Sequence, residues 1–261
     1  MSMNGPERGG TEAPMVRLGV IETLGVLLLF VVVWQAWVSL LQVPAIVAPT
    51  PLDAVRGIAA NWQTMLRATA FTLGAALLGL ILGTALGASL AMLSWLNVFI
   101  AGFLLPVALV AQTVPVVVLV PVIARLVGYD VRSAITIAVI ISFFPTFVFL
   151  RGGLSRTPAG SADLFTVYGA SRWQRLLRLA IPSAMPSLLA VLKITGPGCI
   201  FAALVAELLM GTPGLGFVIS SSVLLLKLDV GWGAAAIALL ISVFIFTLAV
   251  GMERRWRGLW T

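Results

Sequence analysis

The segment ATAFTLGAALLGLILGTALGASLAML, residues 68–93, decides the fold class of this chain. It contains no charged residue, and the uncharged run that it opens extends from Arg67 to Arg125. One membrane-spanning helix needs about 20 apolar residues, so this run is too long for a helix in a soluble core. Gly79 and Gly83 form a small-xxx-small pair in it, which allows helices to approach closely in lipid. The sequence therefore predicts an all-α polytopic membrane protein.

The composition agrees with this prediction and excludes other classes. Of the 261 residues, 61% are hydrophobic and 10% are charged, whereas soluble domains are about half apolar and a quarter charged. The net charge is +7, but the cations are scattered between apolar segments, which fits membrane topology and not a nucleic-acid groove. There is no His, and Cys199 is the single cysteine. We therefore expect no catalytic residues, no metal site and no disulfide.

Polar breaks divide the chain into six expected spans. Proline interrupts two of them: the third contains Pro106, Pro115 and Pro121, and the fifth contains Pro197-Gly198. A broken helix at membrane depth is tolerated where protein or a water-filled cavity covers it. We expect the spans at about residues 18–41, 68–93, 98–127, 133–150, 185–210 and 230–252.

Shorter segments complete the predicted organisation. Residues 1–16 are polar and rich in Gly and Pro, which predicts a disordered cytoplasmic tail, and residues 17–258 form a single transmembrane domain. Residues 50–67, with Pro51 in the first turn, predict an amphipathic helix at the membrane surface. Residues 94–97 predict a tight turn.

The distribution of Lys and Arg predicts the orientation. If both termini are cytoplasmic, the inside segments hold ten cations and the outside segments hold five. Positive charges favour the cytoplasmic side, so residues 151–180 are predicted to form a cytoplasmic loop. The inside set is Arg8, Arg17, Arg151, Arg156, Arg172, Arg175, Arg178, Arg254, Arg255 and Arg257, and the outside set is Arg56, Arg67, Arg125, Arg132 and Lys227.

That loop contains the sequence ADLFTVYGASRWQRLLRLAIP, residues 162–182. Ser161 is suited to cap a first short helix, with Asp163 in its first turn. Gly169 allows a sharp turn, after which Ser171 and Gln174 have the spacing of a capping box. A helix-turn-helix outside the bilayer is therefore predicted over about residues 155–181, ending where Pro182 marks the start of the fifth span.

This loop resembles the cytoplasmic "EAA" loop of ABC importer permeases, because an acidic residue precedes Gly169 by six positions and an apolar-Pro pair follows it by thirteen. The likeness extends over about residues 20–258 and is greatest to the nitrate/sulfonate/taurine branch. Asp163 stands where the family has Glu, and Leu164 and Phe165 stand where it has Ala. The other matching pieces are APTP at 48–51, QTVP at 112–115, FFP at 143–145, GASRWQ at 169–174, Pro182 with Pro186, Ala206-Glu207, and GLGF at 214–217.

The resemblance implies a type I ABC importer permease fold with about six spans in the bacterial inner membrane. It also implies a homodimer of this chain, two cytosolic ATPase subunits that bind ATP and Mg, and an extracytoplasmic binding protein. The chain has no GxxxxGK[ST] phosphate loop of its own. The residues implied to couple the chain to the ATPase are Asp163, Leu164, Val167, Tyr168, Gly169, Ala170, Ser171, Arg172, Arg175 and Pro182.

Two polar residues in apolar segments are candidates for the translocation path. Glu207 lies deep in the fifth span, where a carboxylate is costly, and it either lines the path or belongs to a structural ion pair. Gln112 either faces the path or makes a hydrogen bond between helices. Lys193 is expected to extend its ammonium group toward the membrane surface.

Two other classes of protein fit the sequence less well than an importer. A secondary transporter would show paired broken helices in two related halves, and no such repeat is evident. A membrane enzyme would need titratable groups at one depth, and the acids here are scattered. The solute itself is not encoded in a recognisable motif, because the binding protein of such importers does most of the selecting.

Overall fold

The computed structural model describes the backbone of residues 20–257 and the side chains of residues 25–97 and 99–256. The predicted tail, residues 1–16, lies outside this described part. Within it, every regular element is a helix, as the sequence predicted. The elements are α1 Val20–Leu40, α2 Pro51–Ala60, α3 Trp62–Leu96, α4 Val98–Ala111, α5 Val116–Val127, α6 Val131–Leu154, α7 Ser161–Val167, α8 Arg172–Arg175, the π-helical η1 Leu176–Ala180, α9 Ile181–Met210, α10 Leu215–Leu224 and α11 Leu228–Arg257.

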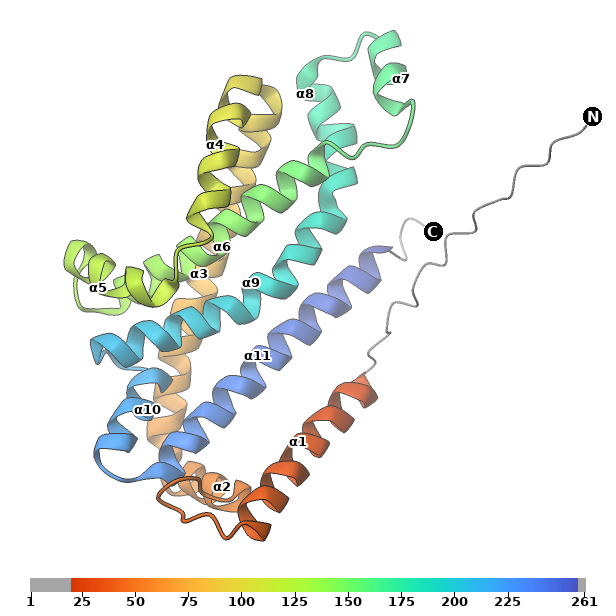
Figure 1. Ribbon diagram of the computed structural model, residues 1–261. Helices are drawn as coiled ribbons and strands as arrows, with labels where there is room; N and C mark the ends of the chain where they lie inside the picture. The colour runs from red at the N-terminus through yellow and green to blue at the C-terminus, as the bar shows by residue number, and fades with distance from the viewer. Residues whose placement is uncertain (1–19, 258–261) are drawn as a thin grey trace, which may run out of the picture.

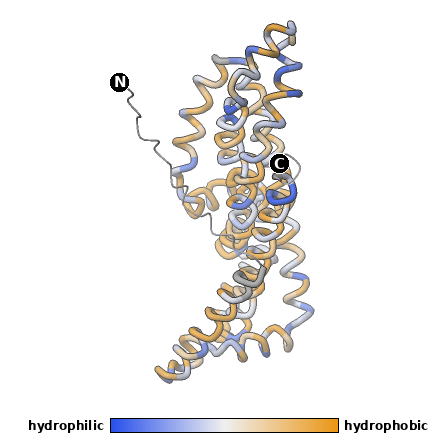
Figure 2. Tube along the Cα trace, turned by 90° about the vertical axis from the view of Figure 1, so that its right-hand side faces the viewer, coloured by the Kyte–Doolittle hydropathy of each residue, from blue (hydrophilic) through white to orange (hydrophobic). Residues whose placement is uncertain are grey.

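Long helices connect two distinct ends of the molecule. Figure 1 shows α7 and α8 at one end, α2 and α10 at the other, and α3, α9 and α11 running toward the second end. Hydrophobic residues cover most of the helical tube in Figure 2, and hydrophilic stretches occur in the α7–α8 region. The helical body is therefore predominantly apolar, and the hairpin carries both polar and apolar residues.

Within the described part of the chain, four helices are long and apolar enough to cross a membrane: α3, α6, α11 and a continuous helix from Arg172 to Met210. The pair α4 and α5 is bent by 107° and supplies a fifth span if it counts as one. This bend confirms the predicted interruption of the third span at Pro115. The predicted interruptions at Pro106 and Pro121 are wrong, because these prolines lie inside α4 and α5. The remaining candidate for a membrane span is α1, whose backbone helix is 21 residues long. Its part with described side chains, Gly25–Leu40, is one of the shorter apolar helices.

The most extensive helix pair is α3 and α6. Gly79, Gly83 and Gly87 of α3 face α6 so closely that added Cβ atoms would meet its side chains and backbone. At Gly87 the added atom would be 2.6 Å from the carbonyl oxygen of Phe143. Both helices also pack against α9 through a buried cluster that includes Ile137 and Ile200. The predicted small-residue contact between helices is thus confirmed.

Three predicted boundaries need correction. The surface helix ends at Ala60 and not at Arg67, because Asn61 closes it by donating from its side chain to the Gly57 carbonyl oxygen. The turn at residues 94–97 reduces to Asn97, since the Ser94 hydroxyl is satisfied inside α3 by the Ala91 carbonyl oxygen. The prediction that Pro197-Gly198 interrupts the fifth span is wrong, because α9 continues through both residues.

Packing explains why α9 continues through Pro197. Proline removes one backbone donor, and in lipid the freed carbonyl must be accommodated by neighbouring groups. Thr195, Cys199 and Ile200 are buried around this position, and the chain of α9 is held against both α6 and α11. The surrounding helices therefore stabilise a helical segment that the local sequence alone would break.

Candidate functional site: a helical hairpin and a buried carboxylate

The predicted helix-turn-helix is present as α7 and α8, joined by a tight turn. Gly169 in this turn has a φ of 67°, a left-handed conformation that favours glycine. The Ala170 amide donates to the Phe165 carbonyl oxygen at 2.9 Å, which closes the turn onto α7. The expectation for Gly169 is confirmed, and its φ fixes the angle between the two helices.

The start of α8 is stabilised by the capping box that the sequence predicted. The Gln174 amide donates to the Ser171 hydroxyl at 3.2 Å, and the Ser171 amide donates to the Gln174 side-chain oxygen at 2.8 Å. Two backbone donors without helical partners are thereby satisfied.

The start of α7 differs from the prediction for Ser161. Gly160, with a φ of 75°, precedes the helix, and Ser161 is its first residue. No side chain caps this end. A serine inside the first turn has its hydroxyl beside the helix and not in front of the free amides, so the cap assigned to Ser161 is wrong.

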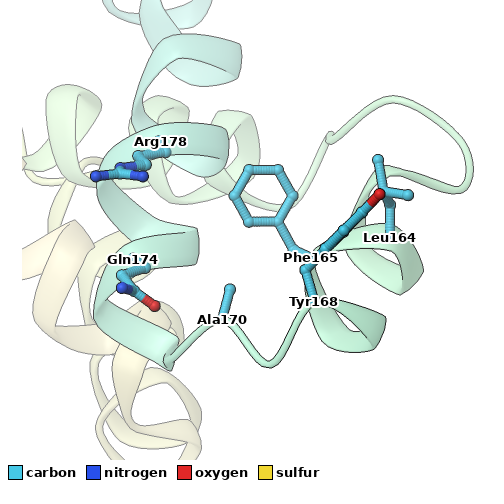
Figure 3. A pocket seen from close by; sticks show the side chains of 6 residues that line it. All are labelled: Leu164, Phe165, Tyr168, Ala170, Gln174 and Arg178. Atoms are coloured by element: carbon cyan, nitrogen blue, oxygen red, sulfur yellow. The ribbon is translucent and has the colours of Figure 1, made fainter.

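The hairpin exposes an apolar surface. Val167 and Tyr168 are 84% and 81% exposed, and Leu164 and Trp173 are also exposed. A hollow of about 290 Å³ lies between the two arms. In Figure 3, Phe165 points from α7 toward the helix that carries Gln174 and Arg178. The predicted coupling set omitted Phe165, Gln174 and Arg178, which only the folding of one arm against the other brings together.

Contacts at the base join the hairpin to the long helices. The Arg175 guanidinium donates to the Thr166 hydroxyl at 3.3 Å, and the Arg172 guanidinium lies 3.5 Å from the Leu96 carbonyl oxygen of α3. Leu176 is fully buried in a cluster with residues of α3 and α6. Pro182 lies away from the turn, in the first turn of α9. Nine of the ten predicted coupling residues therefore share one hairpin, and Pro182 belongs to the helix that leaves it.

The two candidate path residues have different surroundings. Gln112 ends α4 at the bend before α5, and its side-chain amide lies 3.4 Å from the Ala108 carbonyl oxygen. Glu207 is only 2% exposed. One of its carboxylate oxygens accepts from the Thr72 hydroxyl at 2.8 Å and from the Gly216 amide at 3.0 Å. The structure thus places Glu207 in a junction of α3, α9 and α10.

Lys193 has a charged partner that the sequence did not predict. Its ammonium group lies 2.5 Å from a carboxylate oxygen of Glu253 in α11. The Glu253 side chain is 10% exposed and that of Lys193 is 26% exposed. A counter-charge stabilises an ammonium group in an apolar segment. The pair spans 60 positions of sequence, so helix periodicity gave no signal for it.

At the opposite end from the hairpin, Thr50 and Asp53 cap α2. The Asp53 amide donates to the Thr50 hydroxyl, and the Thr50 amide donates to the Asp53 carboxylate, each at 3.2 Å. Hydrogen bonds from Thr50 and the nearby Arg56 charge hold the pKa of Asp53 below its ordinary value. Among the described residues, no three His, Cys, Asp or Glu side chains are grouped as a metal site would require.

Comparison with known proteins agrees with this architecture. Residues 79–258 match the family model "Binding-protein-dependent transport system inner membrane component". The riboflavin transport system permease protein RibX of Chloroflexus aurantiacus is 32% identical over 250 residues, 92% of this chain and 91% of the relative. The formylaminopyrimidine transport permease protein ThiX of Halalkalibacterium halodurans is 31% identical over 191 residues, 73% of this chain and 76% of the relative. The taurine transport system permease protein TauC of Escherichia coli is 26% identical, covering 91% and 88%.

Solved structures share the fold. A chain of the MetNI methionine ABC transporter, in an inward-facing conformation, aligns with a TM-score of 0.67 and 15% identity, covering 75% of this chain and 97% of that chain. A chain of an amino acid ABC transporter crystallised with histidines gives a TM-score of 0.63 and 16% identity, covering 76% and 96%. At these identities the likeness establishes the fold alone. The family match over residues 79–258 and the similarity to RibX show that this chain belongs to the binding-protein-dependent transport system inner membrane component family and is a multi-pass permease subunit of an ABC importer, not an enzyme.

Proposed function

We propose that two copies of this chain form the translocation path of an ATP-driven importer for a small organic solute. An extracytoplasmic binding protein delivers the solute, and two cytosolic ATPase subunits bind ATP and Mg and drive the cycle. The observation that carries this proposal is the exposed helical hairpin at one end of the body. An ATPase can move a permease only through a surface that both protrudes and is rigidly joined to the spans.

The hairpin has both properties. Its turn is fixed by the left-handed Gly169 and by the capping box at Ser171, and its exposed residues Val167 and Tyr168 supply an apolar contact surface. The second arm continues without a break into α9, because residues 172–210 form one helix. A displacement of α8 by the ATPase is therefore passed to a span directly and not through a loop.

The proposed orientation places the hairpin and both termini in the cytoplasm. The excess of Lys and Arg in the corresponding segments supports it. Figure 1 is compatible with this arrangement, since α1 ends and α11 begins at the α2 end of the molecule. The α2 and α10 end would then face the outside, where the binding protein docks.

For the solute, heterocyclic organic molecules are the first candidates. The two relatives above 30% identity are named for formylaminopyrimidine and riboflavin transport, whereas those named for sulfonates and taurine are less similar. Uptake of radiolabelled pyrimidines, riboflavin and taurine by cells with and without this chain would separate these classes. Uptake of taurine alone would contradict the heterocyclic assignment. Within the path, we assign Gln112 to the wall near the α4–α5 bend.

Gly169→Val tests the coupling function. Valine is strained at a φ of 67°, so the turn should reorganise. We expect the variant to insert in the membrane but to lose most of its co-purifying ATPase and ATP-dependent uptake. Gly152→Val is the matched control, because Gly152 lies in helix α6 with no atom near its added Cβ. Normal ATP-dependent uptake by Gly169→Val would contradict the coupling role of this turn, and uptake without any ATPase would favour a secondary transporter.

A further inference from the structure

A short helix at the outer end has an unusual N-terminal support. α10 contains 10 residues and is therefore about 15 Å long, which is too short to cross a membrane core of about 30 Å. Its inner face is buried, with Leu215 and Val218 packed in a cluster with Met65 of α3 and Ala234 of α11. Its outer face exposes Phe217, and Leu224 at its end is 84% exposed. α10 thus packs against the helical body through one face only.

The first residues of α10 cannot cap themselves. The residue before the helix is Gly214, which has no side chain and a φ of 152°. The Leu215 amide instead donates to the Thr72 hydroxyl at 2.9 Å, and the Gly216 amide donates to the Glu207 carboxylate at 3.0 Å. Thr72 in turn donates to the same carboxylate oxygen. Side chains of α3 and α9 therefore supply the N-terminal cap of a third helix, where a negative charge is favourable.

Close packing around this cap requires glycine at positions 214 and 216. A Cβ added at Gly214 would collide with the Glu207 carboxyl group, and one added at Gly216 would collide with the Leu204 carbonyl oxygen and lie 2.9 Å from the Glu207 Cβ. Thr72, Glu207 and Leu215 are each no more than 2% exposed. None of the ion pairs found in the described part of the chain includes Glu207. The carboxylate is thus held by α10 itself and by Thr72.

The position of Glu207 along its helix links this cap to the hairpin. The continuous helix that carries it begins at Arg172 in the hairpin and ends at Met210. Its 39 residues correspond to about 58 Å at 1.5 Å per residue. Movement of the hairpin therefore acts on one end of a helix whose other end holds α10.

We propose that Glu207 and Thr72 are positioning residues that fasten the start of α10 to α9 and α3, so that α10 moves with α9 during the ATP cycle. This inference rests on the proposed coupling function of the hairpin. It assigns Glu207 a role in the translocation path that is exerted through α10 and not by contact with the solute.

The test uses the purified permease–ATPase complex reconstituted into membranes. The permease carries a single cysteine, Phe217→Cys in a Cys199→Ala background. The rate of labelling by a membrane-impermeant maleimide is measured without nucleotide and after trapping with MgATP and vanadate. A lost buried hydrogen bond shifts a conformational equilibrium by about tenfold or more. With the cap intact, we expect trapping to change the labelling rate at Phe217→Cys by about tenfold. In Thr72→Val, the change in labelling rate should fall below about twofold while ATP hydrolysis continues.

Two further variants separate positioning from loss of stability. Thr72→Ser keeps the hydroxyl and should restore the response. Thr195→Val removes another buried hydroxyl, one that bonds only within α9 to the Val191 carbonyl oxygen, and should respond like the intact chain. A full response in Thr72→Val, no response with the cap intact despite ATP hydrolysis, or equal losses in Thr72→Val and Thr195→Val would overturn the inference. Failure of the proposed function is distinguishable, because the chain would then not support ATP hydrolysis at all.

Discussion

Gly83 shows how much a single side chain matters in the α3–α6 contact. A Cβ on Gly83 would collide with the Ser142 hydroxyl and the Val139 carbonyl of α6, whereas the same atom on Gly74, in the same helix, would meet nothing within 4 Å. In lipid, where apolar burial supplies no driving force between helices, such close backbone approach provides much of the attraction.

Gly83→Ala should therefore destabilise the subunit by about 1–3 kcal/mol, the usual effect of overpacking a tight contact. The measurement is the free energy of unfolding in detergent, or the midpoint of thermal denaturation. Gly74→Ala is the control, and it should leave stability unchanged or raise it slightly, because alanine is the better helix former. Equal stabilities of the two variants would contradict the packing described for α6.

The ion pair between Lys193 and Glu253 is the second feature at this scale. It joins α9 to the end of α11 at 2.5 Å in a half-buried setting. Glu253 also takes part in interactions other than this pair, so replacing it alone removes more than one contact. A double-mutant cycle is needed to isolate the coupling.

Lys193→Met should lower the free energy of unfolding by about 1–3 kcal/mol, less than for a fully buried pair because the ammonium side is partly exposed. Combining it with Glu253→Gln should cost less than the sum of the two single changes. Strict additivity would show that the two groups do not stabilise each other. The exposed pair Arg132 with Asp130 serves as the comparison, where we expect much weaker coupling.

Among the elements, the hairpin has the clearest local determinants. The capping box at Ser171 is needed because α8 has only four residues before the helix becomes π-helical at Leu176. A lost cap typically costs about 1 kcal/mol. Because this cap lies at the free end of the helix over residues 172–210, its loss should loosen the adjoining turn at Gly169.

We therefore expect Ser171→Ala to raise the rate of backbone hydrogen exchange across residues 169–175 by about fivefold, as a loss of 1 kcal/mol implies, and to weaken ATPase binding in proportion. Ser171→Thr retains the hydroxyl and is the control. The same exchange measurement at Ser161→Ala should show little change, because no cap hydrogen bond starts α7. A large effect there would indicate that the assignment of the two helix starts is reversed.

The same contrast explains what the sequence could predict. Gly169, the capping box at Ser171 and the break before Pro115 are local signals, since each depends on residues within a few positions, and all three were confirmed. The predicted break at Pro197 is wrong, because packing against α6 and α11 stabilises α9 despite the helix-breaking propensity of proline. Glu207 and Lys193 found partners 135 and 60 positions away, a separation at which helical periodicity carries no information.

For the whole molecule, the distribution of polar groups determines how it can lie in a bilayer. The hairpin is at one end of the molecule and the capped helix α2 is at the other. The helices α1, α4 and α5 carry many exposed apolar side chains. These surfaces suit lipid or a second copy of the chain. The orientation follows only from the charges at the two ends.

Cysteine labelling in intact cells tests that orientation. In a Cys199→Ala background, Ser161→Cys and Ser171→Cys should resist a membrane-impermeant maleimide until the cells are opened. Val55→Cys in α2, which is 59% exposed, should react from outside without opening the cells. The reverse pattern would place the hairpin outside and exclude contact with a cytosolic ATPase.

The cap shared by Thr72, Glu207 and Gly216 also imposes an order on biosynthesis. Thr72 is made long before Glu207, and Gly216 follows Glu207 by nine residues. While α9 is being inserted, its carboxylate therefore lacks one of its two donors, in an environment where an unsatisfied carboxylate is costly. α3 must already be in place beside α9 to supply the Thr72 hydroxyl, and the translation of α10 completes the site. The two hydrogen-bond donors of Glu207 are therefore synthesised at different times, Thr72 before it and Gly216 after it. A chain that ended before Gly216 would leave the carboxylate without one of these donors in the bilayer.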